Sequence, residues 1–223
     1  MILLVTTCRR TGGQYLEDLI RVVDESGWQG PRFLISDGEP PLAASWPTIT
    51  TNEPTGQMRT YWRALAVGVD QARLQGDSKI LILEDDVELC RNALQYMERA
   101  ALPPNIGFVT LFDGHVVPRG SRHGLYRIPA RHFFCLQGVI WTLAAAEKLL
   151  SAPDAAVWSE PHRGDNLIAQ ILARDYYGVH VPNLVQHRGA VSICNPGQQL
   201  DGVRTANNYP GPEFDALTLI DRS

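Results

Sequence analysis

Ile80-Leu81-Ile82-Leu83-Glu84-Asp85-Asp86 is the stretch of the chain that most narrows its fold and its chemistry. Four consecutive apolar side chains are typical of a strand that is buried on both faces of a parallel sheet. Three carboxylates follow at once, and unpaired like charges at one point repel each other. Clustered carboxylate oxygens are the ligands that Mg²⁺ and Mn²⁺ prefer, which favours a divalent-cation site. The alternative is a solvated strand end with Asp86 near the start of the next helix.

The chain before this stretch alternates between strand and helix patterns. Residues 2–6 form another continuous apolar run, and residues 33–35 form a shorter one that ends in a Ser-Asp-Gly turn. Apolar residues at helical spacing predict helices over residues 15–23 and 58–72. This order predicts an α/β fold with a mostly parallel central sheet flanked by helices, in which ligands bind at the carboxyl ends of the strands. Such ends carry residues 6–10, Asp37 and residues 84–86.

The second half of the chain has a more mixed pattern. The remaining predicted strands are residues 48–50, 107–111, 133–140 and 179–181, and the remaining predicted helices are residues 91–100, 143–150 and 166–175. Residues 195–212 are rich in Gly, Pro and Asn, so we predict a loop there, either a lid over a ligand or an inert surface excursion.

Length and composition indicate one ordinary globular domain. The chain has 223 residues, of which 44% are apolar and 20% are charged, which excludes disordered, collagen-like and coiled-coil proteins. A net charge of -4 argues against a generally basic binder of nucleic acid or anionic membrane. The four scattered cysteines fit neither a disulfide-rich module nor a zinc site. No stretch is long and apolar enough to span a bilayer, so we expect a cytoplasmic protein without a transmembrane segment.

The order of these features resembles that of GT-A glycosyltransferases, which use nucleotide sugars and carry an Asp-X-Asp or Glu-Asp-Asp motif after an apolar strand. The resemblance covers most of the chain and is to the compact bacterial or phage type. It implies a Rossmann-like GT-A sheet in one domain, residues 1–223. The implied parts are a donor-binding half (1–100), an acceptor and catalytic half (101–194) and a loop-rich tail (195–223).

The resemblance also implies roles for residues of the first half. Asp86 would bind Mn²⁺ or Mg²⁺, whereas Glu84 and Asp85 would contact the ribose or the donor sugar. The donor would be a UDP-sugar, because uridine diphosphate is the commonest donor nucleotide among the enzymes that the chain resembles. The other implied donor contacts are Thr6, Thr7, Arg9, Arg10, Asp37 and Arg59. Of these, Asp37 equally fits an ordinary turn and Arg9 a surface charge.

Two residues of the second half complete the implied site. Asp165 opens an amphipathic segment, where an Asp is also a favoured helix cap, and the resemblance implies that it is the catalytic base. Glu160 is the fallback for that role. His187 follows a predicted strand and turn, and the resemblance implies that it is the second protein ligand of the metal ion, although a lone histidine is more often structural.

The acceptor is suggested only by aromatic and basic residues. Trp141 and Trp158 fit either stacking on a sugar ring or core packing. Residues 114–146 contain no acidic side chain, and the arginines and histidines of residues 115–132 either form a solvated face or receive an anionic acceptor. The acceptor classes left open are a glycan, a small molecule, a protein and a hydroxylated DNA base.

The resemblance implies a metal-dependent, inverting hexosyl- or N-acetylhexosaminyl-transferase. One alternative is a nucleotidyltransferase with a related sheet. Such enzymes have a glycine-rich first loop, which Thr11-Gly12-Gly13 matches only in part. Another is a non-catalytic module that binds a nucleotide or a carbohydrate. Release of UDP rather than pyrophosphate would exclude the nucleotidyltransferase. Turnover of the donor would exclude the non-catalytic binding module.

Overall fold

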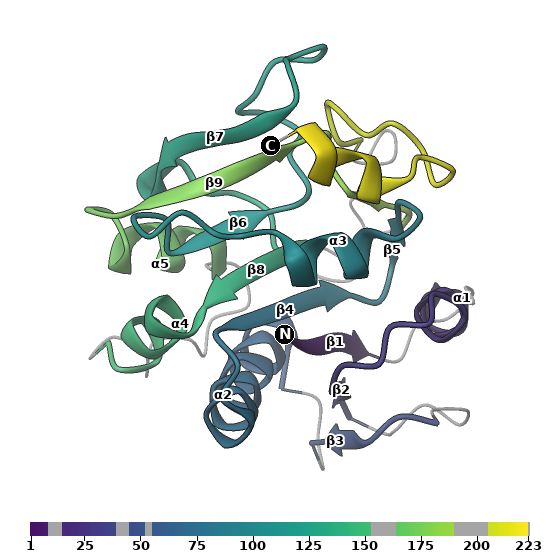
Figure 1. Ribbon diagram of the computed structural model, residues 1–223. Coiled ribbons are helices and arrows are strands. Elements are labelled where there is room, and N and C mark those ends of the chain that lie inside the picture. The colour runs from purple at the N-terminus through teal and green to yellow at the C-terminus, as the bar shows by residue number, and fades with distance from the viewer. Residues whose placement is uncertain (9–14, 39–44, 52–54, 153–163, 190–204, 223) are drawn as a thin grey trace.

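The computed structural model describes residues 1–8, 15–38, 45–51, 55–152, 164–189 and 205–222, and it contains an eight-stranded sheet with helices on both faces (Figure 1). The strand order across the sheet is β3-β2-β1-β4-β8-β6-β9-β7. Its strands are β1 (Ile2–Cys8), β2 (Arg32–Asp37), β3 (Thr48–Thr50), β4 (Lys79–Glu84), β6 (Phe108–Thr110), β7 (Gly124–Pro129), β8 (Gly138–Thr142) and β9 (Tyr176–Val181). The α-helices are α1 (Tyr15–Glu25), α2 (Gln57–Gln75), α3 (Ala93–Arg99), α4 (Leu143–Leu150) and α5 (Gly164–Ile171), and the 3₁₀ helices are η1 (Ala130–His132) and η3 (Ala216–Arg222).

The first half of the sheet brings the ends of three strands together. Strands β3, β2, β1 and β4 are all paired in parallel. In this register Thr6 of β1 lies beside Glu84 of β4, and Cys8 of β1 lies beside Asp37 of β2. Because parallel strands end at the same edge of a sheet, we call this the carboxyl edge and use the name below.

The second half of the sheet mixes strand directions. Strand β8 is antiparallel to both β4 and β6, β9 is parallel to β6, and β7 is antiparallel to β9. The sheet therefore has four parallel and three antiparallel pairs, and the predicted α/β class with a mostly parallel sheet is confirmed. The sequence did not predict β7, because this edge strand has no buried residue and so lacks an apolar run.

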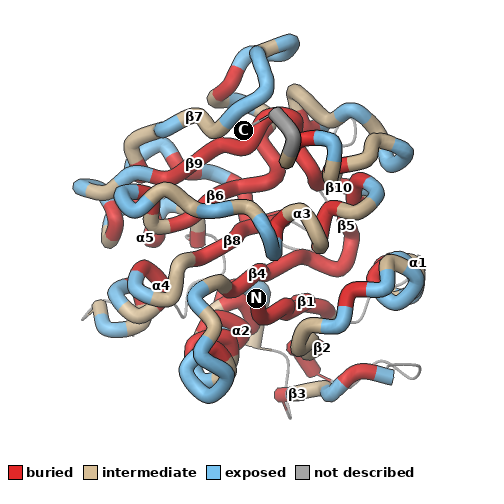
Figure 2. Tube along the Cα trace, viewed as in Figure 1, coloured by how far each residue is buried: buried red, intermediate tan, exposed pale blue. Residues whose placement is uncertain are grey.

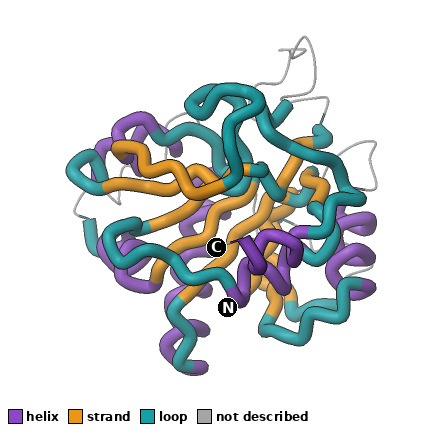
Figure 3. The backbone as a smooth tube through the Cα atoms, turned by 45° about the horizontal axis from the view of Figure 1, so that its top comes forward, coloured by secondary structure: helices purple, strands orange, loops and turns teal. Residues whose placement is uncertain are grey.

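The central strands are buried on both faces. Even-numbered residues of β1 and β4 pack with α2, α4 and α5, and their odd-numbered apolar residues pack with α1, α3 and η3. Figure 2 shows this buried centre, and Figure 3 shows the helices that cover it. Successive strand residues point to opposite faces, so a strand covered on both faces carries a continuous apolar run.

A second, two-stranded sheet lies next to the acid motif. It pairs β5 (Val87–Leu89) with β10 (Val185–His187) in antiparallel register. The C-terminal segment packs against it, since the Tyr209 hydroxyl donates to Glu88 Oε2 at 3.1 Å and the Ala206 N–H donates to Gln186 Oε1 at 2.9 Å. The ribbon is therefore held in place from outside by residues 205–222.

Three predicted boundaries are wrong. The strand predicted over residues 133–140 begins only at Gly138, because Phe133 and Leu136 enter the core from an irregular segment. Helices α3 and α5 are shorter than predicted, since residues 91–92 precede α3 and residues 172–175 follow α5. Among the residues that the structure describes, no helix is both long and apolar enough to cross a membrane.

Candidate active site

The acid motif lies at the carboxyl edge, inside the protein. Glu84, Asp85 and Asp86 are only 7%, 3% and 3% exposed. Glu84 ends β4, and its N–H donates to the Gln137 carbonyl at 3.2 Å. A buried carboxylate is strongly unfavourable unless it is hydrogen-bonded, paired or bound to a cation. The motif is therefore not a solvated strand end.

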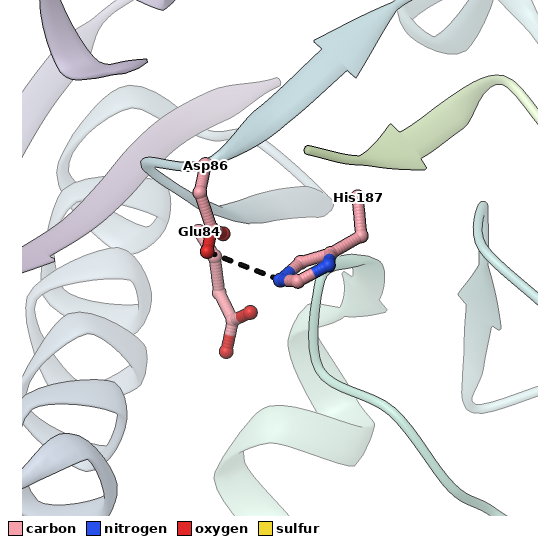
Figure 4. Close-up of side chains that lie close together, drawn as sticks. All are labelled: Glu84, Asp86 and His187. Atoms are coloured by element: carbon pink, nitrogen blue, oxygen red, sulfur yellow. Dashed lines mark ion pairs between the residues drawn. The ribbon is translucent and has the colours of Figure 1, made fainter. Parts of the chain in front are cut away.

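The β5–β10 ribbon brings His187 to Asp86. Asp86 directly precedes β5, and His187 ends β10 opposite Val87. The backbone continues this pairing, since the Arg188 N–H donates to the Asp86 carbonyl at 2.7 Å. The side chains meet as a result, with His187 Nε2 at 3.1 Å from Asp86 Oδ2, the contact that is dashed in Figure 4.

Glu84, Asp86 and His187 together form a group that fits a divalent cation. Each offers one ligand atom, and these three atoms lie within 4.8 Å of one another (Figure 4). The Nδ1 atom of His187 is buried and has no hydrogen-bond partner among the described residues. Carboxylate oxygens with one imidazole suit Mn²⁺ and related ions. The structure thus places Glu84 beside Asp86 and His187, the two residues that the sequence analysis expected to bind a metal ion.

Gly189 lies directly against this group. A Cβ atom built on Gly189 would overlap Asp86 Oδ2 and would lie 3.1 Å from both Cε1 and Nε2 of His187. Any larger residue would therefore displace one of these two side chains. The Gly189 backbone therefore lies directly against the side chains of Asp86 and His187, which agrees with a site that surrounds a small ligand such as a metal ion.

Polar neighbours support the other carboxylates. Thr7 Oγ1 donates to Asp85 Oδ2 at 2.7 Å, and both residues are buried. Gln57, at the start of α2, donates from its side-chain amide to Glu84 Oε1. The Thr6 hydroxyl donates to a backbone carbonyl of β4 at 3.3 Å. Thr6 and Thr7 thus lie at the acid motif, and Thr7 orients Asp85.

Asp37 holds the segment that leads into α2. Its Oδ1 atom accepts from the Thr55 hydroxyl at 3.0 Å, and its Oδ2 atom accepts from the Gly56 N–H at 2.8 Å. The Thr55 N–H and the Thr51 hydroxyl donate to Oδ1 as well. Burial alone would raise the pKa of Asp37, but these hydrogen bonds outweigh burial and hold its pKa below the ordinary 3.8. The carboxylate therefore positions the amino end of α2.

We expect Asp37→Asn to lower the free energy of unfolding by about 2 kcal/mol at pH 7, because the amide loses charge-assisted hydrogen bonds. A carboxyl whose pKa is depressed by folding stabilises the native state above its unfolded pKa, and this stability is lost as the pH falls through the folded pKa. The deficit should therefore shrink below about pH 4. Urea unfolding at pH 7 and pH 3 measures it, with the exposed Asp70→Asn as control. An equal deficit at both pH values would contradict the assignment.

Asp165 lies in the first turn of α5. The helix starts against α2, because a Cβ atom on Gly164 would overlap the Met58 side chain. Asp165 Oδ2 accepts the Cys135 N–H at 2.8 Å. Cys135 has a φ of 83°, a conformation that non-glycine residues rarely adopt. The irregular segment before β8 thus orients the carboxylate.

The charges of Asp165 and Glu84 both act on the hydroxyl of Tyr61. Burial raises the pKa of Tyr61, a hydrogen bond from Trp141 opposes the rise, and the charges of Glu84 and Asp165 add to it. Both carboxylates therefore lie within electrostatic range of one hydroxyl. Trp141 is fully buried and donates to that hydroxyl at 2.9 Å, so core packing is the correct interpretation of Trp141.

The remaining predicted residues are less closely tied to this site. Arg59 is exposed on α2. In the basic segment, the Arg127 guanidinium lies 3.6 Å from the centroid of the Tyr176 ring. Strand β7 carries Arg127 along the sheet edge and away from the carboxyl edge, since Gly124 pairs with Val181 and Pro129 with Tyr176. Outside the described residues lie Arg9, Arg10, Trp158 and Glu160.

Sequence reasoning missed several residues of the site. Gln57, Tyr61 and Gly189 carry no local signal, because each matters only through a partner that is distant in the sequence. Cys135 was missed because it lay inside a wrongly predicted strand. Gly189 could have been found from the sequence only because it lies two residues after His187, which was already a candidate metal ligand.

No protein-family model matches the sequence, and no curated protein matches it. Among solved structures, the Staphylococcus aureus TarS fragment 1–349 is similar at 12% identity and a TM-score of 0.52, over 82% of this chain and 58% of that one. A glycosyltransferase involved in glycosylation of the major capsid of PBCV-1 has 14% identity and a TM-score of 0.48, over 86% and 95%. A cytidylyltransferase from Leptospira borgpetersenii has 13% identity and a TM-score of 0.47, over 99% and 92%.

The fold is of the GT-A class. The chain spans 58% of the TarS fragment, and at 12% identity this likeness concerns the fold alone. The Rossmann-like GT-A sheet that the resemblance implied is therefore confirmed. The reaction has to be argued from the residues at the carboxyl edge of this GT-A sheet.

Proposed function

We propose that the protein is a metal-dependent glycosyltransferase that moves a hexosyl or N-acetylhexosaminyl group from a UDP-sugar to an acceptor hydroxyl with inversion at the anomeric carbon. The observation that carries the proposal is the buried group of Glu84, Asp86 and His187 at the carboxyl edge, whose ligand atoms lie within 4.8 Å of one another. In open α/β sheets, this edge is where ligands bind.

The cation-binding group supplies the donor side of the proposed site. Asp86 and His187 would hold Mn²⁺ or Mg²⁺, and Glu84 would be a third ligand or a contact to the donor sugar. A bound divalent ion stabilises negative charge on a departing diphosphate. Asp85, which Thr7 orients, would accept a hydroxyl of the ribose or the sugar.

Further donor contacts are proposed from the same edge. Thr6 lies two residues before the end of β1, Asp37 ends the neighbouring β2, and Arg9 and Arg10 follow β1 directly in the sequence. Two arginines would add positive charge toward the diphosphate. Arg59, exposed near the amino end of α2, is the most peripheral proposed donor contact.

Asp165 is proposed to be the catalytic base. As the acceptor oxygen bonds to the anomeric carbon, the bond from that carbon to the diphosphate oxygen breaks, and Asp165 takes the hydroxyl proton. The products are the glycosylated acceptor, UDP and a protonated Asp165, and no covalent enzyme intermediate forms. The hydrogen bond from the Cys135 N–H supports this role because it fixes the orientation of the carboxylate.

A screen of nucleotide sugars tests the proposal. We expect UDP-sugars with Mn²⁺ to raise the melting temperature, since a ligand of the native state increases stability. We also expect UDP to be released from the donor when an acceptor is present, and slowly by hydrolysis when it is absent. Pyrophosphate release from a nucleoside triphosphate and a sugar phosphate would instead indicate a nucleotidyltransferase. Binding of a UDP-sugar without any turnover would indicate a binding module.

A further inference from the structure

Phe134 is an exposed aromatic residue at the carboxyl edge. Its side chain is 43% exposed, and the other large exposed apolar residues among those described, Val22, Leu74 and Tyr176, lie on α1, near the end of α2 and at the start of β9. Exposure of a large ring costs free energy, so a partly exposed ring beside a buried site is a candidate contact for a ligand.

Two segments hold this ring in place. The His115 ring lies 5.2 Å from the Phe134 ring, centroid to centroid. His115 is carried by a turn that the buried Asp113 organises, because the Asp113 carboxylate accepts the N–H groups of His115 at 3.1 Å, Val116 at 2.9 Å and Val117 at 2.7 Å. The two rings are tilted by 58° to each other and come from two distant segments. We call this pair of rings the Phe134–His115 platform.

The platform adjoins Asp165. The N–H that donates to Asp165 Oδ2 belongs to the peptide bond between Phe134 and Cys135. The next residues approach the acid motif, since the Gln137 carbonyl accepts the Glu84 N–H at 3.2 Å. In addition, Gln137 is 5% exposed and its Oε1 atom has no hydrogen-bond partner in the described part of the chain. An unsatisfied buried amide oxygen is costly and indicates a ligand hydroxyl or N–H.

We propose that the Phe134–His115 platform is an acceptor subsite that binds a sugar ring, so that the acceptor is a glycan or a glycoside. This inference rests on the proposed glycosyltransferase function and narrows its acceptor. The apolar C–H face of a pyranose packs on the electron-rich face of an aromatic ring. Phe134 would take that face, and Gln137 Oε1 would accept a hydroxyl of the same ligand.

The geometry favours a sugar over the other acceptor classes. Arg127 lies on β7, which runs away from the carboxyl edge, and its guanidinium lies over the Tyr176 ring, so Arg127 does not give the platform one of the cationic contacts that nucleic acid would require.

Saturation-transfer NMR tests the subsite with methyl glucoside, methyl galactoside and methyl N-acetylglucosaminide as probes, in the presence of UDP and Mn²⁺. We expect at least one glycoside to receive saturation at its ring protons. Phe134→Ala should weaken its binding roughly tenfold, whereas Phe134→Tyr, which keeps the ring, should retain it. Leu74→Ala removes an exposed apolar side chain elsewhere and is the matched control.

The outcomes separate the subsite from the proposed function. UDP bound by wild type and by Phe134→Ala alike, with glycoside binding weakened only in the latter, supports the subsite. Glycoside affinity that is unchanged in Phe134→Ala, or glycoside binding that is absent for all three probes in the wild type, overturns it. Failure of the wild type to bind UDP in the presence of Mn²⁺ would instead overturn the proposed function. Thermal unfolding checks that each variant is folded.

Discussion

An Asp165→Asn variant is expected to bind UDP as the wild type does and to transfer sugar about 10²–10⁴-fold more slowly, the range that a positioned general base contributes. The amide cannot take a proton from the acceptor hydroxyl. Its oxygen can still accept the Cys135 N–H, so the contact that orients the side chain survives. The variant therefore removes the proton acceptor and leaves the local structure intact.

Two further variants make this experiment specific. Asp175→Asn changes a partly exposed carboxylate that pairs with Lys148 at the surface, and it should leave turnover unchanged. Asp165→Ala also removes the hydrogen bond to Cys135, so it should lower the melting temperature more than Asp165→Asn does. Turnover by Asp165→Asn close to that of the wild type would reject the assignment. If Glu160→Gln were inactive at the same time, the base would be Glu160.

The fold was predictable wherever burial leaves a local pattern. Strands β1 and β4 are covered on both faces, which requires the apolar runs that residues 2–6 and 80–83 show. The acids that follow β4 mark the end of that strand, so the location of the acid motif followed from the sequence. Strand β7 left no such pattern, because it lies at the edge of the sheet and none of its residues is buried.

The assembled site was only partly predictable. The family resemblance implied that Asp86 and His187 bind the same metal ion. Their contact depends on the pairing of β5 with β10, which the sequence around neither residue predicts. Glu84 joins them because β4 and β5 turn sharply at the motif, and Gln57 and Tyr61 reach it only because α2 points its amino end at the carboxyl edge. Such contacts depend on tertiary packing, which local propensity does not encode.

A Gly189→Ala variant is expected to bind Mn²⁺ about 10–100-fold more weakly than the wild type, the cost typical of disturbing the surroundings of a metal ligand. The added Cβ atom would overlap Asp86 Oδ2 and crowd the His187 ring. One of these side chains would have to move, which separates the ligand atoms that now lie within 4.8 Å of one another with Glu84. Titration of the protein with Mn²⁺, followed by the loss of the electron paramagnetic resonance signal of the free ion, measures this directly.

Gly114→Ala is the matched control for Gly189→Ala, because its Cβ atom would lie 3.3 Å from the Thr205 carbonyl and not near the cation-binding group. We expect this control to bind Mn²⁺ like the wild type. Asp86→Ala removes a ligand outright and sets the lower limit, so transfer by Asp86→Ala should be as low as transfer by wild type in excess EDTA. Unchanged Mn²⁺ affinity in both Gly189→Ala and Asp86→Ala would mean that the buried acids and His187 serve packing rather than metal binding.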